Sequence, residues 1–130
     1  MLYETYLKKD AKSLRKILWK YTSRYVVLRD KNVCFTCGRY GNMAGHFVHS
    51  GNSNNFLLDT DERNLNCQCS QCNLFFNGNL VEYGIRLQRK YGFGITEELL
   101  ALKHQLKKVG VSELVDKIIY FKEKWQSLKE

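Results

Sequence analysis

The amino-acid sequence predicts an α+β fold, and three observations support this prediction. Apolar residues recur at helical spacing near both ends of the chain, the middle is rich in glycine and asparagine, and two pairs of cysteines bracket that middle. A chain of 130 residues can form one sizeable core but not two large domains. We therefore expect a single domain, with a basic helical arm at residues 1–30, a cysteine-containing core at residues 31–94 and a helical hairpin at residues 95–130.

The composition excludes several classes of protein. Hydrophobic residues make up 44% of the chain and aromatic residues 13%, which is too apolar for a disordered or fibrous protein. The longest apolar runs are far too short to span a bilayer, and the first ten residues lack the layout of a secretory signal. We expect a soluble protein without a membrane partner, in a reducing compartment where five cysteines serve as metal ligands rather than disulfides.

Residues 3–25 are predicted to form a basic amphipathic helix. Apolar residues such as Leu14 and Leu18 recur every three or four positions, and lysines and arginines fill the other side. The formal charge of +8 is concentrated here, because residues 1–33 hold nine basic and three acidic residues. This excess indicates a polyanionic partner, and a merely solubilising surface is the alternative. The candidate phosphate-contacting residues are Lys8, Lys9, Lys12, Arg15, Lys16, Lys20 and Arg24.

The middle of the chain is predicted to contain loops and short elements. Glycines and asparagines make residues 38–58 loop-rich, with short strands flanking that stretch. Residues 69–79 begin as a tight turn and continue into a short helix, and residues 80–91 form a further helix that Gly92 ends.

Two helices are expected to pair as a hairpin at the C-terminal end. Thr96 can cap the first, which extends to about residue 108, and Ser112 begins the second. The second helix carries an apolar stripe, which we interpret as core rather than as a partner-binding face. A dimer contact through this hairpin stays open.

The cysteine spacing is the strongest chemical signal. Cys34 and Cys37 form one C-x2-C pair and Cys69 and Cys72 another, and two such pairs fill the tetrahedral shell of a zinc ion. The intervening 31 residues would be an inserted loop between two joined segments. We interpret the fifth cysteine, Cys67, as a small buried side chain.

Histidine, asparagine and acidic residues lie between and just after the cysteine pairs. His46 and His49 come first, an acidic stretch with Asn64 follows, and Asn73 comes directly after the last cysteine. Metal-assisted hydrolysis of a phosphodiester needs a base for water, a divalent ion for the leaving oxygen and an amide to fix the base. A lone histidine near apolar residues is usually structural, so the pattern depends on the whole set of groups.

Several short motifs occur together over residues 10–128: Val27-Leu28-Arg29-Asp30, the two cysteine pairs, Ala44-Gly45-His46-Phe47, Asp61-Glu62-Arg63-Asn64, Asn73, and Gly78-Asn79-Leu80-Val81-Glu82-Tyr83. In this combination the sequence resembles the HNH (ββα-metal) nucleases, and more closely the NinG/Rap family of phage recombination proteins. The resemblance implies a small zinc-stapled ββα-metal (HNH-like) core between the basic N-terminal helix and the C-terminal hairpin.

The resemblance also implies roles for individual residues. His46 stands where the HNH general base stands, Asn64 where an asparagine positions that base, and Asn73 where a residue ligates a catalytic Mg²⁺ or Mn²⁺. Many HNH nucleases carry an Asp or His ligand where this chain has Gly45. The second ligand is therefore open, with Asp61 favoured over His49, Asp59 and Glu62.

The function implied is that of a metal-dependent, structure-selective DNA endonuclease in phage recombination, acting on Holliday junctions or D-loops in the cytoplasm of the bacterial host. A non-catalytic zinc protein that binds branched DNA or a recombination protein is the second hypothesis. A third is an interaction adaptor that works through the C-terminal hairpin. Symmetric cutting of a junction would be simplest for a two-fold homodimer, which the sequence leaves open.

Overall fold

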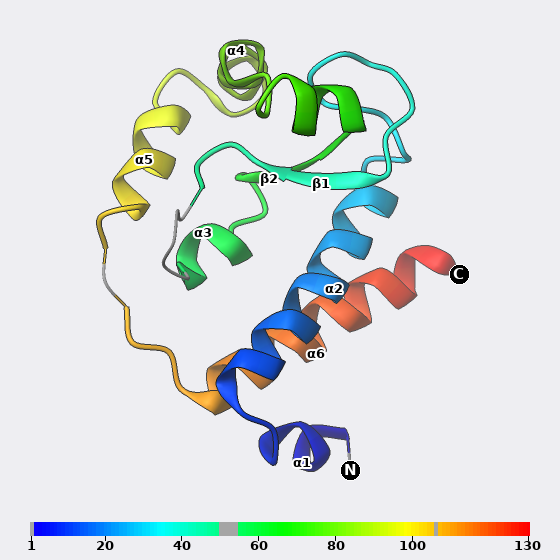
Figure 1. Ribbon diagram of the computed structural model, residues 1–130, viewed down its shortest axis with the longest axis vertical. Helices are drawn as coiled ribbons and strands as arrows, with labels where there is room; N and C mark the ends of the chain where they lie inside the picture. The colour runs from blue at the N-terminus through cyan, green and yellow to red at the C-terminus, as the bar shows by residue number, and fades with distance from the viewer. Residues whose placement is uncertain (1, 50–54, 106) are drawn as a thin grey trace.

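The computed structural model describes residues 2–49, 55–105 and 107–130, which form helices around a two-stranded sheet (Figure 1). None of the described helices is long and apolar enough to cross a membrane. In chain order the elements are α1 (Leu2–Leu7), α2 (Ala11–Arg29), β1 (Met43–His46), α3 (Phe56–Thr60), β2 (Leu65–Gln68), the π-helix η1 (Gln71–Phe75), α4 (Leu80–Tyr91), α5 (Ile95–Leu102) and α6 (Val111–Lys129).

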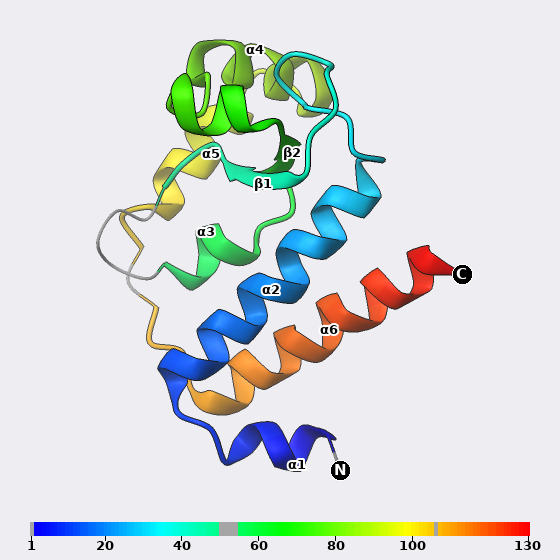
Figure 2. The same cartoon turned by 45° about the vertical axis from the view of Figure 1, so that its right-hand side comes forward.

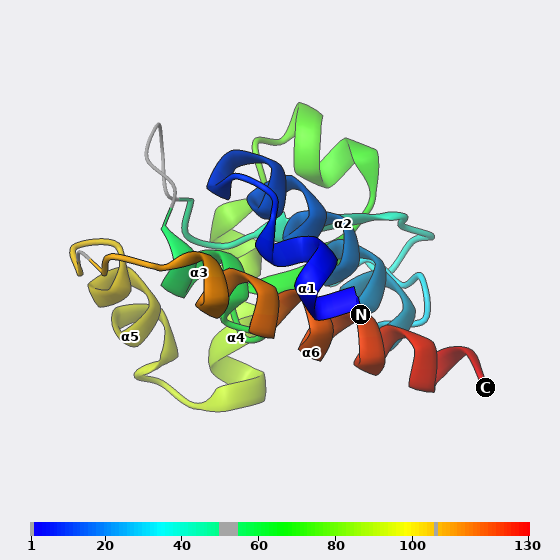
Figure 3. The ribbon, with the colours of Figure 1, turned by 90° about the horizontal axis from the view of Figure 1, so that it is seen from below.

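The predicted N-terminal helix is divided in two. Asp10 separates α1 from α2, because its carboxylate accepts a hydrogen bond from the amide of Ser13 at 2.8 Å and so caps a new helix. The α2 helix then packs along α6, and α1 packs against α6 as well (Figure 3). The apolar stripe of α6 is core, as expected, and lies against the buried face of α2.

The predicted C-terminal hairpin is wrong. The two helices exist, but α5 packs against α4 and α3 while α6 packs along α2, and residues 107–110, which form neither helix nor strand, lead into α6 (Figure 2). The reason is that each helix completes a different core. Ile95 and Leu99 of α5 are buried with Tyr83 and Leu87 of α4, whereas α6 is buried with α2.

The sheet separates these two cores. β1 and β2 pair antiparallel, with Gly45 opposite Asn66 and His46 opposite Leu65. Ala44 and Leu65 belong to the core that α2 and α6 form. The buried hydroxyl of Tyr83 on α4 donates to the Gly45 carbonyl at 2.7 Å and accepts from Asn66 at 3.1 Å. His46 therefore lies at the end of a strand that is fixed from both sides.

A short helix, α3, overlaps the end of the stretch 38–58 that was expected to be loop. The Asn55 side chain caps it by accepting from the amide of Leu58 at 3.1 Å, and Leu58 is fully buried in the second core. The short helix predicted within residues 69–79 is present as the π-helix η1, which includes Cys72, and the helix predicted from residue 80 is present as α4. The turn between them uses left-handed backbone at Asn77, Gly78 and Asn79.

Candidate functional site

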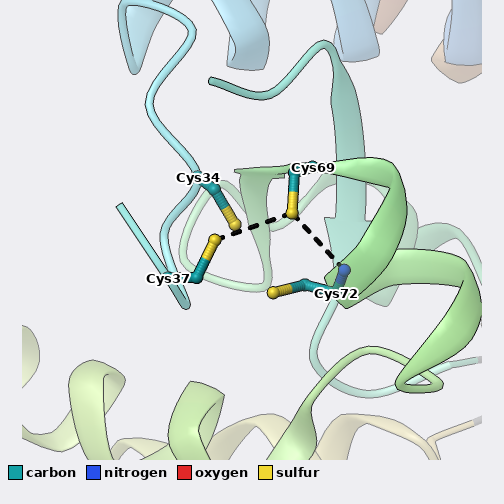
Figure 4. Close-up of side chains that lie close together, drawn as sticks. All are labelled: Cys34, Cys37, Cys69 and Cys72. Atoms are coloured by element: carbon teal, nitrogen blue, oxygen red, sulfur yellow. Dashed lines mark hydrogen bonds between the residues drawn. The ribbon is translucent and has the colours of Figure 1, made fainter. Parts of the chain in front are cut away.

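The four cysteines of the two C-x2-C pairs come together at one point. Their sulfur atoms all lie within 4.8 Å of one another, and the sulfurs of Cys37 and Cys69 are 3.6 Å apart (Figure 4). A tetrahedral zinc with bonds of about 2.3 Å would hold four sulfurs about 3.8 Å apart, so the cluster could hold a metal ion such as zinc. Cys34 and Cys72 are buried, and Cys37 is the most exposed of the four.

Backbone hydrogen bonds shape the first pair into a tight turn. The amide of Cys34 donates to the carbonyl of Arg39 at 2.7 Å, and the amide of Gly38, whose φ is +80°, donates back to the carbonyl of Cys34 at 2.9 Å. The amide of Phe35 donates to the carbonyl of Cys67 at 2.7 Å and so ties this turn to β2. Cys67 itself is fully buried, and burial raises the pKa of its thiol to about 11. The interpretation of Cys67 as a structural side chain agrees with this environment.

The thiols of the cluster differ in their tendency to ionise. Burial opposes ionisation of Cys34, but hydrogen bonds from Thr36 and from the backbone of Cys69 outweigh it and lower its pKa to about 6. Burial, together with hydrogen bonds between its thiol and the sulfurs of the other three cysteines, raises the pKa of Cys37 to about 12. Four thiolates this close repel one another, and a divalent cation would remove that repulsion.

His46 is held by one carboxylate and one aromatic ring. Its Nε2 lies 3.0 Å from Oδ1 of Asp59 on α3, and its ring stacks on Trp19 of α2 with ring centroids 4.9 Å apart and planes 16° apart. The sequence marked Asp59 only as a candidate metal ligand. No signal showed it as a partner of His46, because α3 was not predicted.

His46 lies between two clefts. The first, of about 710 Å³, is lined by His46, His49, Asn73 and Arg24 among others. The rings of His46 and His49 have centroids 5.3 Å apart. Burial, followed by the charge of His46, lowers the pKa of His49, which favours its neutral ring. Three of the predicted site residues, from β1, the following loop and η1, are thus brought to one cleft.

The second cleft, of about 700 Å³, joins His46 to the basic side of α2. Asp59 and His46 line it together with Lys12, Arg15 and Lys16. The other predicted basic residues are spread further along the chain. Lys8 and Lys9 are exposed ahead of α2, the ammonium group of Lys20 lies 5.3 Å from the ring of Tyr21, and Arg24 lies over Trp125 at 5.2 Å.

Asn64 is fully buried, and its side chain bonds only to backbone groups. Its side-chain oxygen accepts from the amide of Val48 at 2.8 Å, and its nitrogen donates to the carbonyls of Val48 at 3.0 Å and Leu58 at 3.1 Å. Asn64 therefore fixes the segment after His46 against the end of α3. It can position His46 through the backbone rather than through the imidazole.

Two of the candidate ligands are engaged elsewhere. Both oxygens of Asp61 accept from Arg63, at 3.0 and 2.8 Å, and Arg63 also donates to Glu98 at 2.8 Å. The oxygens of Glu62 accept from Tyr25 at 2.8 Å and Tyr120 at 3.0 Å, which joins α2 to α6. Neither carboxylate lines the two clefts beside His46.

The side-chain amide of Gln68 occupies the space that a side chain at residue 45 would need. A Cβ at residue 45 would collide with Oε1 of Gln68 and would lie 3.1 Å from Oδ1 of Asn73. Gln68 is fully buried, and its nitrogen donates to the Gly78 carbonyl at 2.9 Å and to Thr36 at 3.1 Å. Among the described residues, Gln68 Oε1 is the buried side-chain atom without a hydrogen-bond partner. No motif or spacing in the sequence pointed to Gln68.

Fold and site together define the class of protein: an α+β protein with a small two-stranded sheet and a candidate four-cysteine metal centre formed by segments before β1 and after β2. The family model described as Bacteriophage Lambda NinG protein matches residues 5–130, so the chain belongs to the NinG family of phage recombination-associated proteins. The family expected from the motifs is thereby confirmed. Comparisons with curated proteins and with solved structures gave no match.

Proposed function

We propose that this NinG-family chain is a metal-dependent HNH-type endonuclease that hydrolyses DNA phosphodiester bonds in branched recombination intermediates, such as Holliday junctions or D-loops. The observation that carries the proposal is the pair of His46 and Asp59, placed where a cleft lined by Asn73 meets a cleft lined by basic residues. A base, a hard oxygen donor and phosphate-binding cations are the groups that this hydrolysis needs.

His46 is the general base of the proposed reaction. A carboxylate only accepts hydrogen bonds, so Asp59 keeps the proton of the neutral ring on Nε2. Nδ1 is then free to take a proton from the attacking water. Stacking on Trp19 limits rotation of the ring, and Asn64 holds the backbone that follows it.

The order of elements supports the HNH assignment. An antiparallel pair of strands is followed directly by a helical segment, with His46 at the end of the first strand and Asn73 in η1. Both residues line the same cleft. The cysteine cluster sits at the junction of β2 and η1, where a zinc ion would hold the helical segment against the sheet.

The side-chain oxygen of Asn73 is a suitable donor for Mg²⁺ or Mn²⁺, which prefer oxygen ligands. Such an ion would stabilise charge on the leaving oxygen. Asp61 and Glu62 are not suitable as further ligands, because their oxygens are bonded to Arg63 and to two tyrosines. His49 remains at the cleft.

The substrate is held through its phosphates. Lys12, Arg15 and Lys16 line the cleft that contains His46, so a DNA backbone bound there would lie next to the proposed base. Contacts of this kind are independent of sequence. Selectivity for branched DNA, action in the cytoplasm of the bacterial host, and pairing of two copies to cut opposite strands follow from the family resemblance and complete the proposal.

A non-catalytic zinc protein that binds branched DNA is the second candidate. Gly45 favours it, because this position contributes no metal-ligating side chain. The adaptor hypothesis is less favoured, since the apolar stripe of α6 is already buried against α2.

The test is cleavage of a four-way junction beside a linear duplex, with Mg²⁺, Mn²⁺ or neither. His46→Ala should lower the cleavage rate by about 10²–10⁴-fold or more while junction binding is kept. Asn73→Ala should regain part of its rate at high metal concentration, which His46→Ala should not. His104→Ala, an exposed histidine outside both clefts, is the matched control. Salt-dependent junction binding by the wild type without cleavage would favour the non-catalytic alternative.

A further inference from the structure

Gln68 presents a buried oxygen that the fold leaves without a partner. The orientation of its amide is fixed, because the Gly78 carbonyl can only accept a hydrogen bond and therefore faces the nitrogen. Oε1 is thereby directed at Gly45. Leaving such an acceptor unsatisfied is unfavourable, because the buried oxygen loses the hydrogen bonds that it would make with water. A fully buried, oriented and unpartnered oxygen points to a bound group that satisfies it.

A second amide oxygen lies at the same point. Oδ1 of Asn73 is 3.1 Å from the position that a Cβ of residue 45 would take, and Oε1 of Gln68 overlaps that position. The side-chain oxygens of both residues therefore border the space above Gly45. A cation in that space could bind both oxygens, because neutral amide oxygens are ligands for hard divalent ions.

We infer that Gln68 and Asn73 together bind the divalent ion of the proposed nuclease site. This inference rests on the proposed function for its place in catalysis, although the binding can be tested without cleavage. Gln68 then supplies the oxygen that residue 45 cannot, and Gly45 is required because any side chain there would displace that oxygen. Asn73 also lines the first cleft, so it connects the ion to the space beside His46.

The binding is tested on the wild-type, zinc-loaded chain by adding manganese chloride and recording the side-chain amide resonances by NMR. Mn²⁺ broadens nearby resonances steeply with distance, and this holds even for weak binding. The side-chain NH₂ signal of Gln68 should disappear at Mn²⁺ concentrations at least tenfold below those that broaden Asn55. Asn55 is the control because its amide donates to the carbonyl of Leu102, away from the sheet. Equal broadening of both signals would overturn the inference and leave a bound water as the partner of Gln68.

A ligand exchange gives a second test. Gln68→Ala should weaken Mn²⁺ binding about tenfold or more, measured by electron paramagnetic resonance of free Mn²⁺. The double variant Gly45→Asp with Gln68→Ala should regain affinity, because it places a carboxylate in the vacated space. Zinc content and circular dichroism are measured on each variant, since Gln68 also bonds to Gly78 and Thr36. Unchanged affinity in folded Gln68→Ala would refute the assignment.

The experiments can refute the nuclease function and the ion site at Gln68 independently of each other. Selective broadening of Gln68 in a protein that cleaves no DNA would keep the ion site and reject the nuclease. Metal-dependent cleavage without selective broadening would keep the nuclease and reject Gln68 as a ligand.

Discussion

Asp59 of α3 lies 3.0 Å from Nε2 of His46 at the end of β1, although the two residues are thirteen positions apart. The pair joins α3, a helix that was not predicted from the sequence, to His46, the residue that the family resemblance implies as the general base. Both side chains are partly buried, with 16% of His46 and 29% of Asp59 exposed, so the contact is shielded from solvent yet open to a cleft.

The first prediction concerns this pair. Asp59→Asn can present its amide nitrogen or its oxygen to His46 and so no longer fixes the proton on Nε2. We expect the single-turnover cleavage rate to fall about 10- to 100-fold while junction affinity stays within about twofold. Asp61→Asn is the matched control, because Asp61 bonds to Arg63 and should affect stability more than chemistry. An equal loss of rate in both variants would argue against a special role of Asp59.

The second prediction concerns DNA binding. Lys12→Glu combined with Lys16→Glu should weaken binding irrespective of sequence and should flatten its salt dependence, since each lost phosphate contact lowers the slope of log affinity against log salt by roughly 0.9. The control reverses the same number of charges at Lys31 and Lys117, which line neither cleft beside His46. Fluorescence anisotropy at several salt concentrations measures both pairs. If the two double variants behave alike, only the net charge of the chain matters.

The third prediction concerns the cysteine cluster. We expect one zinc per chain by elemental analysis, and removal of zinc should unfold the segment between the cysteine pairs, because structural zinc contributes about 10 kcal/mol or more in small domains. Cys34→Ser and Cys72→Ser should each lose the metal. Cys67→Ser should keep it, since this thiol is outside the cluster. A chain that binds no zinc while all four cysteines are reduced would contradict the prediction.

The fourth prediction concerns the end of α2. Arg29 donates to the carbonyl of Leu65 at 2.7 Å and pairs with Asp30, whose carboxylate in turn accepts from the amide of Cys67 at 2.8 Å. Arg29→Ala should lower the free energy of unfolding by about 2–4 kcal/mol, because it removes charged hydrogen bonds that join α2 to β2. Arg29→Lys should recover less than half, as an ammonium cannot reproduce the planar guanidinium contacts. Urea unfolding measures both variants, and a loss below about 1 kcal/mol would show that the network is dispensable.

The local features could be predicted from the sequence. Helical periodicity located the core stripe of α6 and the extent of α4, and the C-x2-C spacing located the ligands of the cluster, because these patterns depend on neighbours within a few residues. The division between α1 and α2 was missed, although an Asp able to cap a helix is present at residue 10. Lysines stand on both sides of Asp10, so the basic side of the predicted helix continued without a visible interruption.

Which surfaces meet was decided only by the tertiary structure. Both C-terminal helices were expected, but they were expected to pair with each other, because two apolar stripes carry no information about which of several apolar faces each will bury. The same holds for the site. The sequence by itself determined that a histidine, two asparagines and four cysteines occur in a family order. Only the fold brought Asp59 to His46, engaged Asp61 with Arg63 and placed Gln68 over Gly45, because those contacts depend on strand register and helix packing between distant segments.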